Sequence, residues 1–197
     1  LHLCHHNLES IETNNYDSNN AKHDLLLGVC MAAKYEGQSI RDYYTKHEQT
    51  NLDTKSQICT VLARSFADIG DIVRGRDLFR GNDKEKDQRK KLQQNLKTIF
   101  KNIYKDVTKR NKELKKRYKD TTNYYELRED WWDANRATIW EAMTCKADTG
   151  NAYFHATCGG GKTPTEGYCR CDGDQPGKDM VNVDPPTYFD YVPQYLR

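Results

Sequence analysis

The chain has 197 residues, of which 36% are hydrophobic and 30% are charged, and its formal net charge is +2. No apolar run approaches the ~18 residues that a membrane span requires, so we expect no direct insertion into a membrane. The mean hydropathy of −1.00 is typical of disordered chains, but 13 Tyr, 3 Trp and 5 Phe provide enough buriable surface to predict a folded domain with a thin core.

Charge is distributed unevenly along the chain. Residues 84–119 contain 15 basic and 4 acidic side chains, a net charge of +11. The flanking residues 1–83 and 120–197 have net charges of −3 and −6. A basic segment between acidic ones indicates an anionic partner or an internal electrostatic match, and it argues against a nucleic-acid partner.

Two helices are predicted in the first 75 residues. The first extends from about residue 20 to residue 36, is stopped by Gly37 and resumes over residues 39–47. The second begins at a capping box in residues 54–57, and its apolar residues recur at three-to-four spacing. Gly75 is expected to end this helix, because glycine readily adopts the left-handed conformation of a C-terminal cap.

Two more helices follow, and four helices together suggest an antiparallel bundle. Asn82 with Glu85 predicts the N-cap of the third helix, and apolar residues at helical spacing predict that it runs unbroken over residues 84–119, about 54 Å. The fourth helix is expected over residues 123–145, with Glu126 in the capping position. One side of it is predicted to comprise Leu127, Trp131, Ala134, Thr138 and Ala142.

The chain changes character near residue 147. All five prolines and seven of the 12 glycines lie beyond it, which predicts a loop region over residues 147–197. So long a loop needs covalent attachment, and we expect disulfides to the helices, at Cys145 or Cys59. The pairing stays open, and the odd count leaves one thiol without an internal partner among Cys4, Cys30, Cys59, Cys145, Cys158, Cys169 and Cys171. The predicted fold is an all-α, disulfide-stapled helical bundle with a long Gly/Pro/Cys-rich C-terminal loop region.

Motifs for catalysis and cofactor binding lack their usual context. Residues 156–163 fit a relaxed phosphate-loop pattern, but Pro164 follows at once and no strand precedes, so a flexible, disulfide-anchored loop is the better interpretation. Only Cys169 and Cys171 are closely spaced, which argues against zinc. We find no nucleophile motif and no distinguishable carboxylate pair, so we expect no enzyme, no catalytic residue, no metal and no cofactor. An intracellular nucleotide-binding or metal protein stays as an alternative.

A row of lysines follows the basic segment at intervals of about one helical turn. It is formed by Lys97, Lys101, Lys105, Lys109, Lys112 and Lys116. Such a row can bind a linear polyanion, for example a sulfated polysaccharide, through summed Coulomb attraction and counterion release. The competing interpretation is a solvated outer face that offsets the acidic segments, and composition by itself favours it.

Three motifs in order along the chain resemble those of a known family. They are DIGDIVRG with the following Leu78-Phe79, the tryptophan-rich residues 131–145, and PPTYFDYVPQYLR at residues 185–197. Residues 1–4 and 58–66 fit the same family. Together they resemble the Duffy-binding-like domain, alpha class, of the malaria-parasite erythrocyte membrane protein 1 adhesins, over nearly the whole chain.

The resemblance implies an extracellular, disulfide-rich helical domain within a larger membrane-anchored protein on infected erythrocytes. It implies adhesion to host erythrocyte or endothelial receptors, exposure to antibodies and, in some members, rosetting through heparan sulfate. The lysine row then becomes the expected site for a sulfated glycosaminoglycan; the alternative is a structural and antigenic spacer whose receptor contacts lie elsewhere in the adhesin. Of the family's three subdomains, residues 1–16 are expected to end the first, 17–146 to form the helical bundle, and 147–197 to lead to an absent following subdomain.

Overall fold

The structure is a computed structural model that describes residues 21–50, 58–78, 81–149, 153, 155–165, 167–177 and 185–197. Cys4, the capping box at residues 54–57 and the first predicted region, residues 1–16, lie outside these ranges. Within them the chain is helical, and the one β-bridge joins Cys158 to Thr163. None of the described helices carries a stretch apolar and long enough to cross a membrane.

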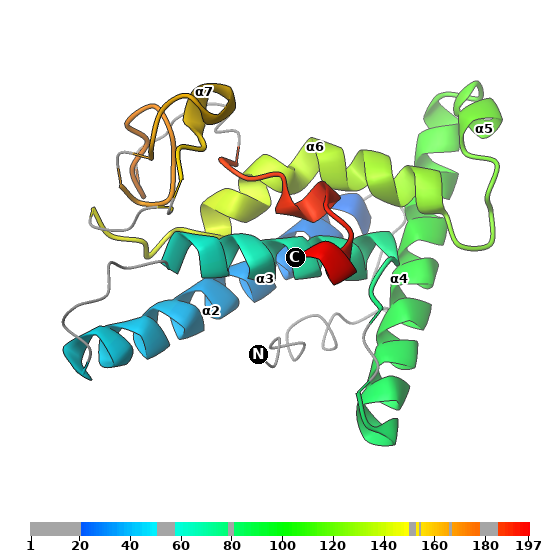
Figure 1. Cartoon of the computed structure of the whole chain (residues 1–197). Helices are drawn as coiled ribbons and strands as arrows, with labels where there is room; N and C mark the ends of the chain where they lie inside the picture. Colours follow the sequence, from blue (N-terminus) through cyan, green and yellow to red (C-terminus); the bar gives the residue numbers. More distant parts are fainter. Residues whose placement is uncertain are drawn as a thin grey trace. The chain divides into compact units, whose positions relative to one another are not determined.

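Figure 1 shows the elements in chain order. The predicted all-α, disulfide-linked fold is confirmed, since two disulfides accompany the helices. The elements are α2 (Ala21–Thr50), α3 (Ile58–Arg74), α4 (Asp83–Arg110), α5 (Leu114–Arg117), α6 (Tyr125–Met143), the short turn α7 (Cys158–Gly161) and the 3₁₀ turns η1 (Phe189–Tyr191) and η2 (Gln194–Leu196).

Contacts between residues divide the chain into two compact units. Unit 1 includes Ala33–Ile69 and Arg136–Arg197, and unit 2 includes Gly70–Asn135 together with the start of α2 as far as Ala32. Helices α2, α3 and α6 therefore contribute residues to both units, while α4 and α5 belong to unit 2. Each unit is described by itself below.

Unit 1 has a core that is rich in aromatic and aliphatic side chains. Phe66 and Trp140 meet edge to face, with their ring centroids 5.2 Å apart. The hydroxyl of buried Ser65 donates to Glu36 at 3.0 Å, which satisfies two polar groups inside the core. The buried apolar side chains include Ile40, Leu62, Phe66, Ile69, Ile139, Trp140 and Met143.

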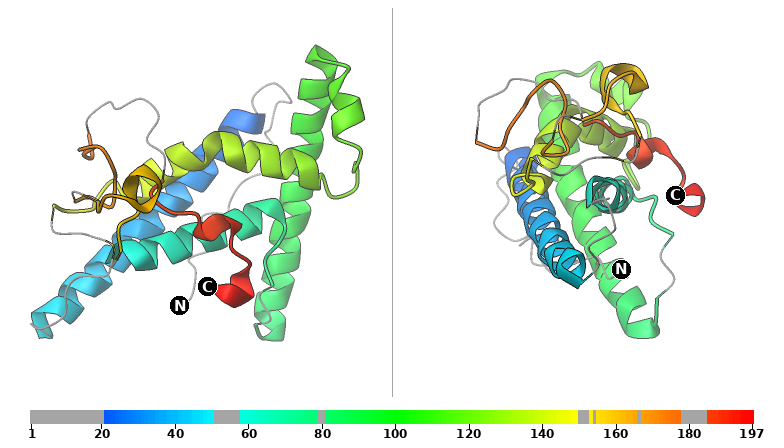
Figure 2. Two further views of the ribbon diagram at one scale, coloured as in Figure 1. Left: turned by 45° about the horizontal axis from the view of Figure 1, so that its top comes forward. Right: turned by 60° about the vertical axis from the view of Figure 1, so that its left-hand side comes forward.

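Unit 2 is built around α4 and the first part of α6. Figures 1 and 2 show α4 steeply inclined to α6, so these two helices cross instead of running antiparallel. Phe100 of α4 meets Trp131 of α6 edge to face at 6.1 Å. Gly70 of α3 lies against Trp132, and an added Cβ would come within 2.8 Å of that ring. The buried apolar residues include Leu25, Val29, Ile72, Val73, Leu92, Leu96, Ile99, Phe100, Ile103, Leu127, Trp131 and Trp132.

The predicted stop of the first helix at Gly37 is wrong, because α2 continues through this glycine to Thr50. The glycine serves a packing role: it is buried, and an added Cβ would overlap the carbonyl oxygen of Met143 at the end of α6. The absence of a side chain lets two helices approach closely, and this tertiary contact outweighs the low helix propensity of glycine.

Substituting Gly37 tests this packing role. We expect Gly37→Ala to lower the free energy of unfolding by about 1–3 kcal/mol, since the new methyl group must displace a backbone carbonyl rather than a flexible side chain. Urea denaturation followed by circular dichroism measures the change. The control is Gln38→Ala at the exposed neighbouring position, which we expect to stay within about 0.5 kcal/mol. Equal stability of the two variants would contradict the close approach.

The predicted unbroken helix over residues 84–119 is also wrong in its second half. Helix α4 has 28 residues and ends at Arg110, so its length is about 42 Å. Asn111 is extended, with φ −137° and ψ 104°, and its side-chain oxygen accepts from the backbone N–H of Glu113 at 3.0 Å. Such a local hydrogen bond offers the backbone an alternative to the helix. Helix α5 then begins at Leu114.

Two of the predicted helix caps, at Asn82 and Gly75, are confirmed, whereas the cap predicted for the fourth helix with Glu126 is not: α6 begins at Tyr125, and Asp120 accepts from the N–H groups of Asn123 and Tyr125. Asn82 accepts from the backbone N–H of Glu85, and Glu85 accepts from that of Asn82, which is a capping box. Gly75 has φ +76° and follows the last residue of α3. Its N–H donates to Ile72, while the N–H of Arg76 donates to the Asp71 carbonyl, the paired bonds of a Schellman motif.

Helix α6 begins and ends within two residues of the predicted bounds, but its buried face differs from the prediction. Ala134 and Thr138 are exposed, whereas Arg128 and Arg136 are buried. Positions 128, 132, 136 and 140 follow one another at intervals of four residues, so two arginines alternate with two tryptophans on the inner side. A count of apolar residues misses this face, because half of the row is cationic.

Disulfides and a buried arginine hold the loop region within unit 1. Cys59 of α3 is bonded to Cys169, and Cys158 to Cys171. Of the two attachment points considered from sequence, the described bond uses Cys59, and Cys145 has a free thiol. Arg170, 2% exposed, donates to Thr144 Oγ1, to Asp174 and to the Glu141 carbonyl, each at 2.8 Å. Cys30 is half-buried on α2.

Candidate functional site

The lysine row lies in unit 2, and the break at Asn111 divides it. Lys101, Lys105 and Lys109 are exposed on α4, and Lys97, one turn earlier, is half-buried. Because α4 ends at Arg110, Lys112 lies in the connection to α5 and Lys116 in α5 itself, so these two do not continue the same helical ridge. Four of the six predicted residues therefore share one ridge, with a repeat of about 6 Å along the axis.

Ion pairs occupy part of the basic segment. Lys116 contacts Glu113 at 2.8 Å, and Arg110 contacts Asp106 at 3.1 Å. Among the described carboxylates, none forms an ion pair with the remaining five lysines of the row, which are Lys97, Lys101, Lys105, Lys109 and Lys112. The charge of these five lysines is therefore available to an external anion.

Helix α5 is attached to α6 by one basic residue of the segment. Arg117 donates two hydrogen bonds to Asp130, at 2.6 and 2.7 Å, and the Tyr118 hydroxyl donates a third at 2.9 Å. The Arg117 guanidinium holds the pKa of Asp130 below its usual range, while burial raises the pKa of Tyr118. Arg117 thus has a positioning role, because it attaches the segment that contains Lys112 and Lys116 to α6.

A cavity of about 190 Å³ opens beside the first lysine of the row. Its lining comes from the residues after α3, the first half of α4 and the start of α6. The lining residues are Gly75, Asp77, Arg89, Gln93, Lys97, Asn123, Tyr125 and Arg128. Arg89 pairs with Asp77 at 3.1 Å, and Asp77 is the one carboxylate among these eight residues, so the lining has an excess of positive charge.

Arg128 is the most buried of the charged residues at this cavity, with 1% of its surface exposed. Its Nη1 donates to Gln93 Oε1 at 3.1 Å and to the Val73 carbonyl at 3.3 Å. Its Nε and Nη2 have no hydrogen-bond partner among the described residues. Burial lowers the pKa of Arg128 to about 10, so the side chain stays charged at neutral pH.

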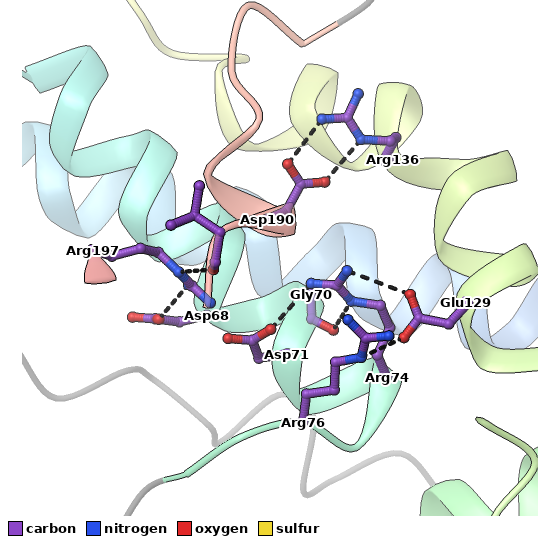
Figure 3. Close-up of polar contacts among 10 residues, drawn as sticks. Asp68, Gly70, Asp71, Arg74, Arg76, Glu129, Arg136, Asp190 and Arg197 are labelled. Atoms are coloured by element: carbon purple, nitrogen blue, oxygen red, sulfur yellow. Dashed lines mark hydrogen bonds and ion pairs between the residues drawn. The ribbon is translucent and has the colours of Figure 1, made fainter. Parts of the chain in front are cut away.

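A second set of buried arginines was not predicted from the sequence. In unit 2, Figure 3 shows Arg74 between Asp71 and Glu129, at 3.1 and 3.5 Å, with Arg76 also bound to Glu129 at 2.7 Å. Arg74 also lies over the Trp132 ring at 5.7 Å. Arg74 lies inside the motif that carried the family resemblance, so the motif residues have a structural role in this unit.

In unit 1, Arg136 anchors the C-terminal segment 185–197. Figure 3 shows its bidentate pair with Asp190, at 2.8 and 2.9 Å, and Arg136 also donates to the Thr187 carbonyl at 2.8 Å. Arg197 binds Asp68 of α3 at 2.9 Å and the Val192 carbonyl at 2.9 Å. The sequence did contain a signal for this role. Arg136 lies one helical turn from Trp132 and from Trp140, and a solvated arginine is not expected on such an apolar helix face.

The loop that fits a phosphate-loop pattern uses its backbone groups internally. Thr157 and Cys158 donate their N–H groups to the Thr163 carbonyl, and Lys162 and Thr163 donate theirs to Cys158. Gly159 and Gly160 have positive φ values within this turn. No group of three or more His, Cys, Asp or Glu side chains in the described part of the chain has the arrangement of a metal site.

Comparisons with known proteins connect these features to a family. The sequence model of the family described as Duffy binding domain matches residues 1–197. The crystal structure of the NTS-DBL1α1 domain of membrane protein 1 (PfEMP1) from the Plasmodium falciparum varO strain is 42% identical, with a TM-score of 0.72, over 99% of this chain and 40% of that chain. The NTS-DBL1α and CIDRγ double domain of the same strain is 41% identical, with a TM-score of 0.72, over 99% of this chain and 25% of that chain.

A third structure, a PfEMP1 DBLβ domain bound to human ICAM-1, is 30% identical, with a TM-score of 0.63, over 99% of this chain and 36% of that chain. Comparison with curated proteins finds no match. The chain spans 40% or less of each of these three structures. The resemblance inferred from the sequence is confirmed by the family match and by the two alpha-class structures. The chain belongs to the Duffy binding domain family.

Proposed function

We propose that this chain is part of an extracellular adhesion module on the infected erythrocyte, and that it binds sulfated glycan, such as heparan sulfate, through the lysine row. The observation that carries the proposal is the exposed ridge of Lys101, Lys105 and Lys109 on α4, which have no ion pair with a described carboxylate. The receptor in one related structure, human ICAM-1, supports host-surface partners for the family as a class. Adhesion also agrees with the expectation that this protein is not an enzyme.

The physical basis is the match between a linear polyanion and a row of cations that follows one inclined ridge of α4. Lysine ammonium groups are strongly hydrated point charges, so they bind sulfate through Coulomb attraction with little demand for geometry. Release of counterions adds to the affinity and makes it depend steeply on salt. The exposed lysines lose little hydration on binding, so moderate affinity and early elution from heparin are expected. Lys112 and Lys116 would contact the same chain beyond the end of α4.

Heparin chromatography tests the row. We expect the triple substitution of Lys101, Lys105 and Lys109 by Gln to move elution to clearly lower salt and to reduce the slope of log affinity against log salt by about 2–3. Glutamine has nearly the same helix propensity as lysine, so α4 is preserved. The control replaces Lys22, Lys34 and Lys162, which are exposed and outside the row, by Gln. Equal elution of both triple variants would contradict the proposed site.

The second candidate function is a structural and antigenic spacer. This chain spans only 40% of the related DBL1α structure. The spacer function is favoured because receptor contacts can lie on the remaining 60% of such a domain. A folded chain that passes through heparin at low salt without retention would support this function. We also propose the domain extents 1–16, 17–146 and 147–197, antibodies as partners and, within the adhesion function, a contribution to rosetting.

A further inference from the structure

The connection between α4 and α5 is exposed and weakly anchored. No side chain in residues 109–117 is buried, and residues 111–113 belong to neither helix. The last four carbonyl groups of a helix lack partners within it, and here the N–H of Asn111 donates to the first of them, that of Val107. Helix α5 is a single turn without a buried residue (Figure 1). Segments with so few buried contacts open locally at a free energy well below that of global unfolding.

One carboxylate, that of Asp130, attaches this segment to α6. Arg117 donates to it at 2.6 and 2.7 Å, and the Tyr118 hydroxyl donates at 2.9 Å. The Arg117 side chain is 61% exposed and that of Asp130 31%, so water competes for the same groups and the attachment is modest in strength. Its release frees residues 109–117, whereas the contact of Phe100 with Trp131 inside unit 2 does not depend on it.

The segment carries the residue types that a trypsin-like serine protease requires. Such a protease binds a cationic side chain before the scissile bond, because its specificity pocket contains a carboxylate. Arg110 and Lys112 are exposed on either side of Asn111, whose backbone is already extended. The ion pair of Arg110 with Asp106 is an obstacle of little weight, since the Arg110 side chain is 66% exposed. Exposed loops of this kind are the preferred places of proteolytic nicking.

The other described basic residues are less accessible to a protease. Most of them lie inside α2, α3, α4 or α6, where the backbone is helical and not extended. Outside the helices, Arg76, Lys119 and Lys146 each adjoin a side chain that is at most 8% exposed. Lys162 lies in the turn that the β-bridge closes, and Arg170 is itself buried. The segment 109–117 is therefore the expected place of the first cut.

We propose that residues 109–117 are a proteolytic nicking site, which opens when Asp130 releases Arg117 and is cut after Arg110 or Lys112 by a trypsin-like serine protease. Hydrolysis adds one water across the peptide bond, so the carbonyl carbon becomes a carboxylate and the amide nitrogen a new α-amino group. The Cys59–Cys169 disulfide joins residues on either side of the cut, so the nicked chain stays one covalent molecule. Nicking does not depend on what the lysine row binds, so it can fail without affecting the proposed function.

Limited digestion of the 197-residue chain with trypsin tests the site. Lys55, Arg80 and Lys178 are first replaced by Gln, so that every remaining bond after Lys or Arg lies in the described ranges. We expect one band on non-reducing electrophoresis and two fragments after reduction, the second beginning at residue 111 or 113. A first cut at any other bond overturns the site, as does resistance of the folded chain to trypsin. Fragments that separate without reductant overturn their retention by the disulfide.

Matched variants test the attachment at Asp130. Asp130→Asn is expected to raise the initial rate of this cut about threefold to tenfold, because cleavage follows the population of the open segment. Arg117→Gln removes the same contact from the other side and should act alike, which separates local opening from global unfolding of one variant. The control is Glu126→Gln, an exposed carboxylate elsewhere on α6, which we expect to leave the rate within about twofold. Equal rates for Asp130→Asn and Glu126→Gln overturn the role of the attachment.

Discussion

Removing the Cys59–Cys169 disulfide is expected to lower the free energy of unfolding by about 4–5 kcal/mol, the largest effect of any change considered for this chain. The two cysteines are 110 residues apart in the sequence, so their bond closes a long loop and strongly restricts the unfolded chain. Both residues are fully buried, and the bond ties α3 to the loop region of unit 1. The measurement is urea denaturation of Cys59→Ala/Cys169→Ala under oxidising conditions.

The second disulfide provides a matched control. Cys158 and Cys171 are 13 residues apart, and by the same dependence on loop length their replacement by alanine should cost about 3 kcal/mol. The difference between the two double variants should disappear under reducing conditions, which open the one disulfide that each variant retains. A loss from Cys59→Ala/Cys169→Ala that is smaller than the loss from Cys158→Ala/Cys171→Ala would refute the loop-length argument.

Asp190→Asn is expected to destabilise the chain by about 3–5 kcal/mol, because it leaves the charged Arg136 buried without its carboxylate. The Asp190 side chain is 0% exposed and that of Arg136 9%, so water cannot replace the lost partner. Asp190 also holds segment 185–197 near α6 through the two hydrogen bonds from Arg136. Chemical denaturation gives the change in stability, and limited proteolysis should show earlier cleavage within this segment.

An exposed ion pair supplies the comparison for this substitution. Glu113→Gln removes the carboxylate that contacts Lys116, and both of these side chains are mostly exposed, so we expect a change below about 1 kcal/mol. The double variant Arg136→Met/Asp190→Leu should be more stable than Asp190→Asn, because it removes both buried charges. If Asp190→Asn were as mild as Glu113→Gln, the Arg136–Asp190 pair would not be the anchor of the C-terminal segment.

The candidate site was predictable in part. The spacing of Lys97, Lys101, Lys105 and Lys109 follows from the sequence and the helix period, and the structure keeps these four on one ridge. The separation of Lys112 and Lys116 from that ridge depends on a local hydrogen bond of Asn111, a signal that was present in the sequence but weaker than the apolar pattern. The cavity could not be predicted from the sequence, because Arg128 and Gly75 are 53 positions apart and come together only in the folded chain.

What the sequence determined by itself was the helical class, the capping box at Asn82, the glycine cap at Gly75 and the approximate bounds of α6. These depend on residues within about four positions of one another, so local physics decides them. Tertiary structure alone decided the course of α2 through Gly37, the partners of Cys59 and Cys158, and the burial of Arg128 and Arg136. Each of these features depends on a group that is distant in the sequence. At Gly37 the close packing outweighs the low helix propensity of glycine, and at Arg136 the charge of Asp190 lowers the cost of burying the guanidinium.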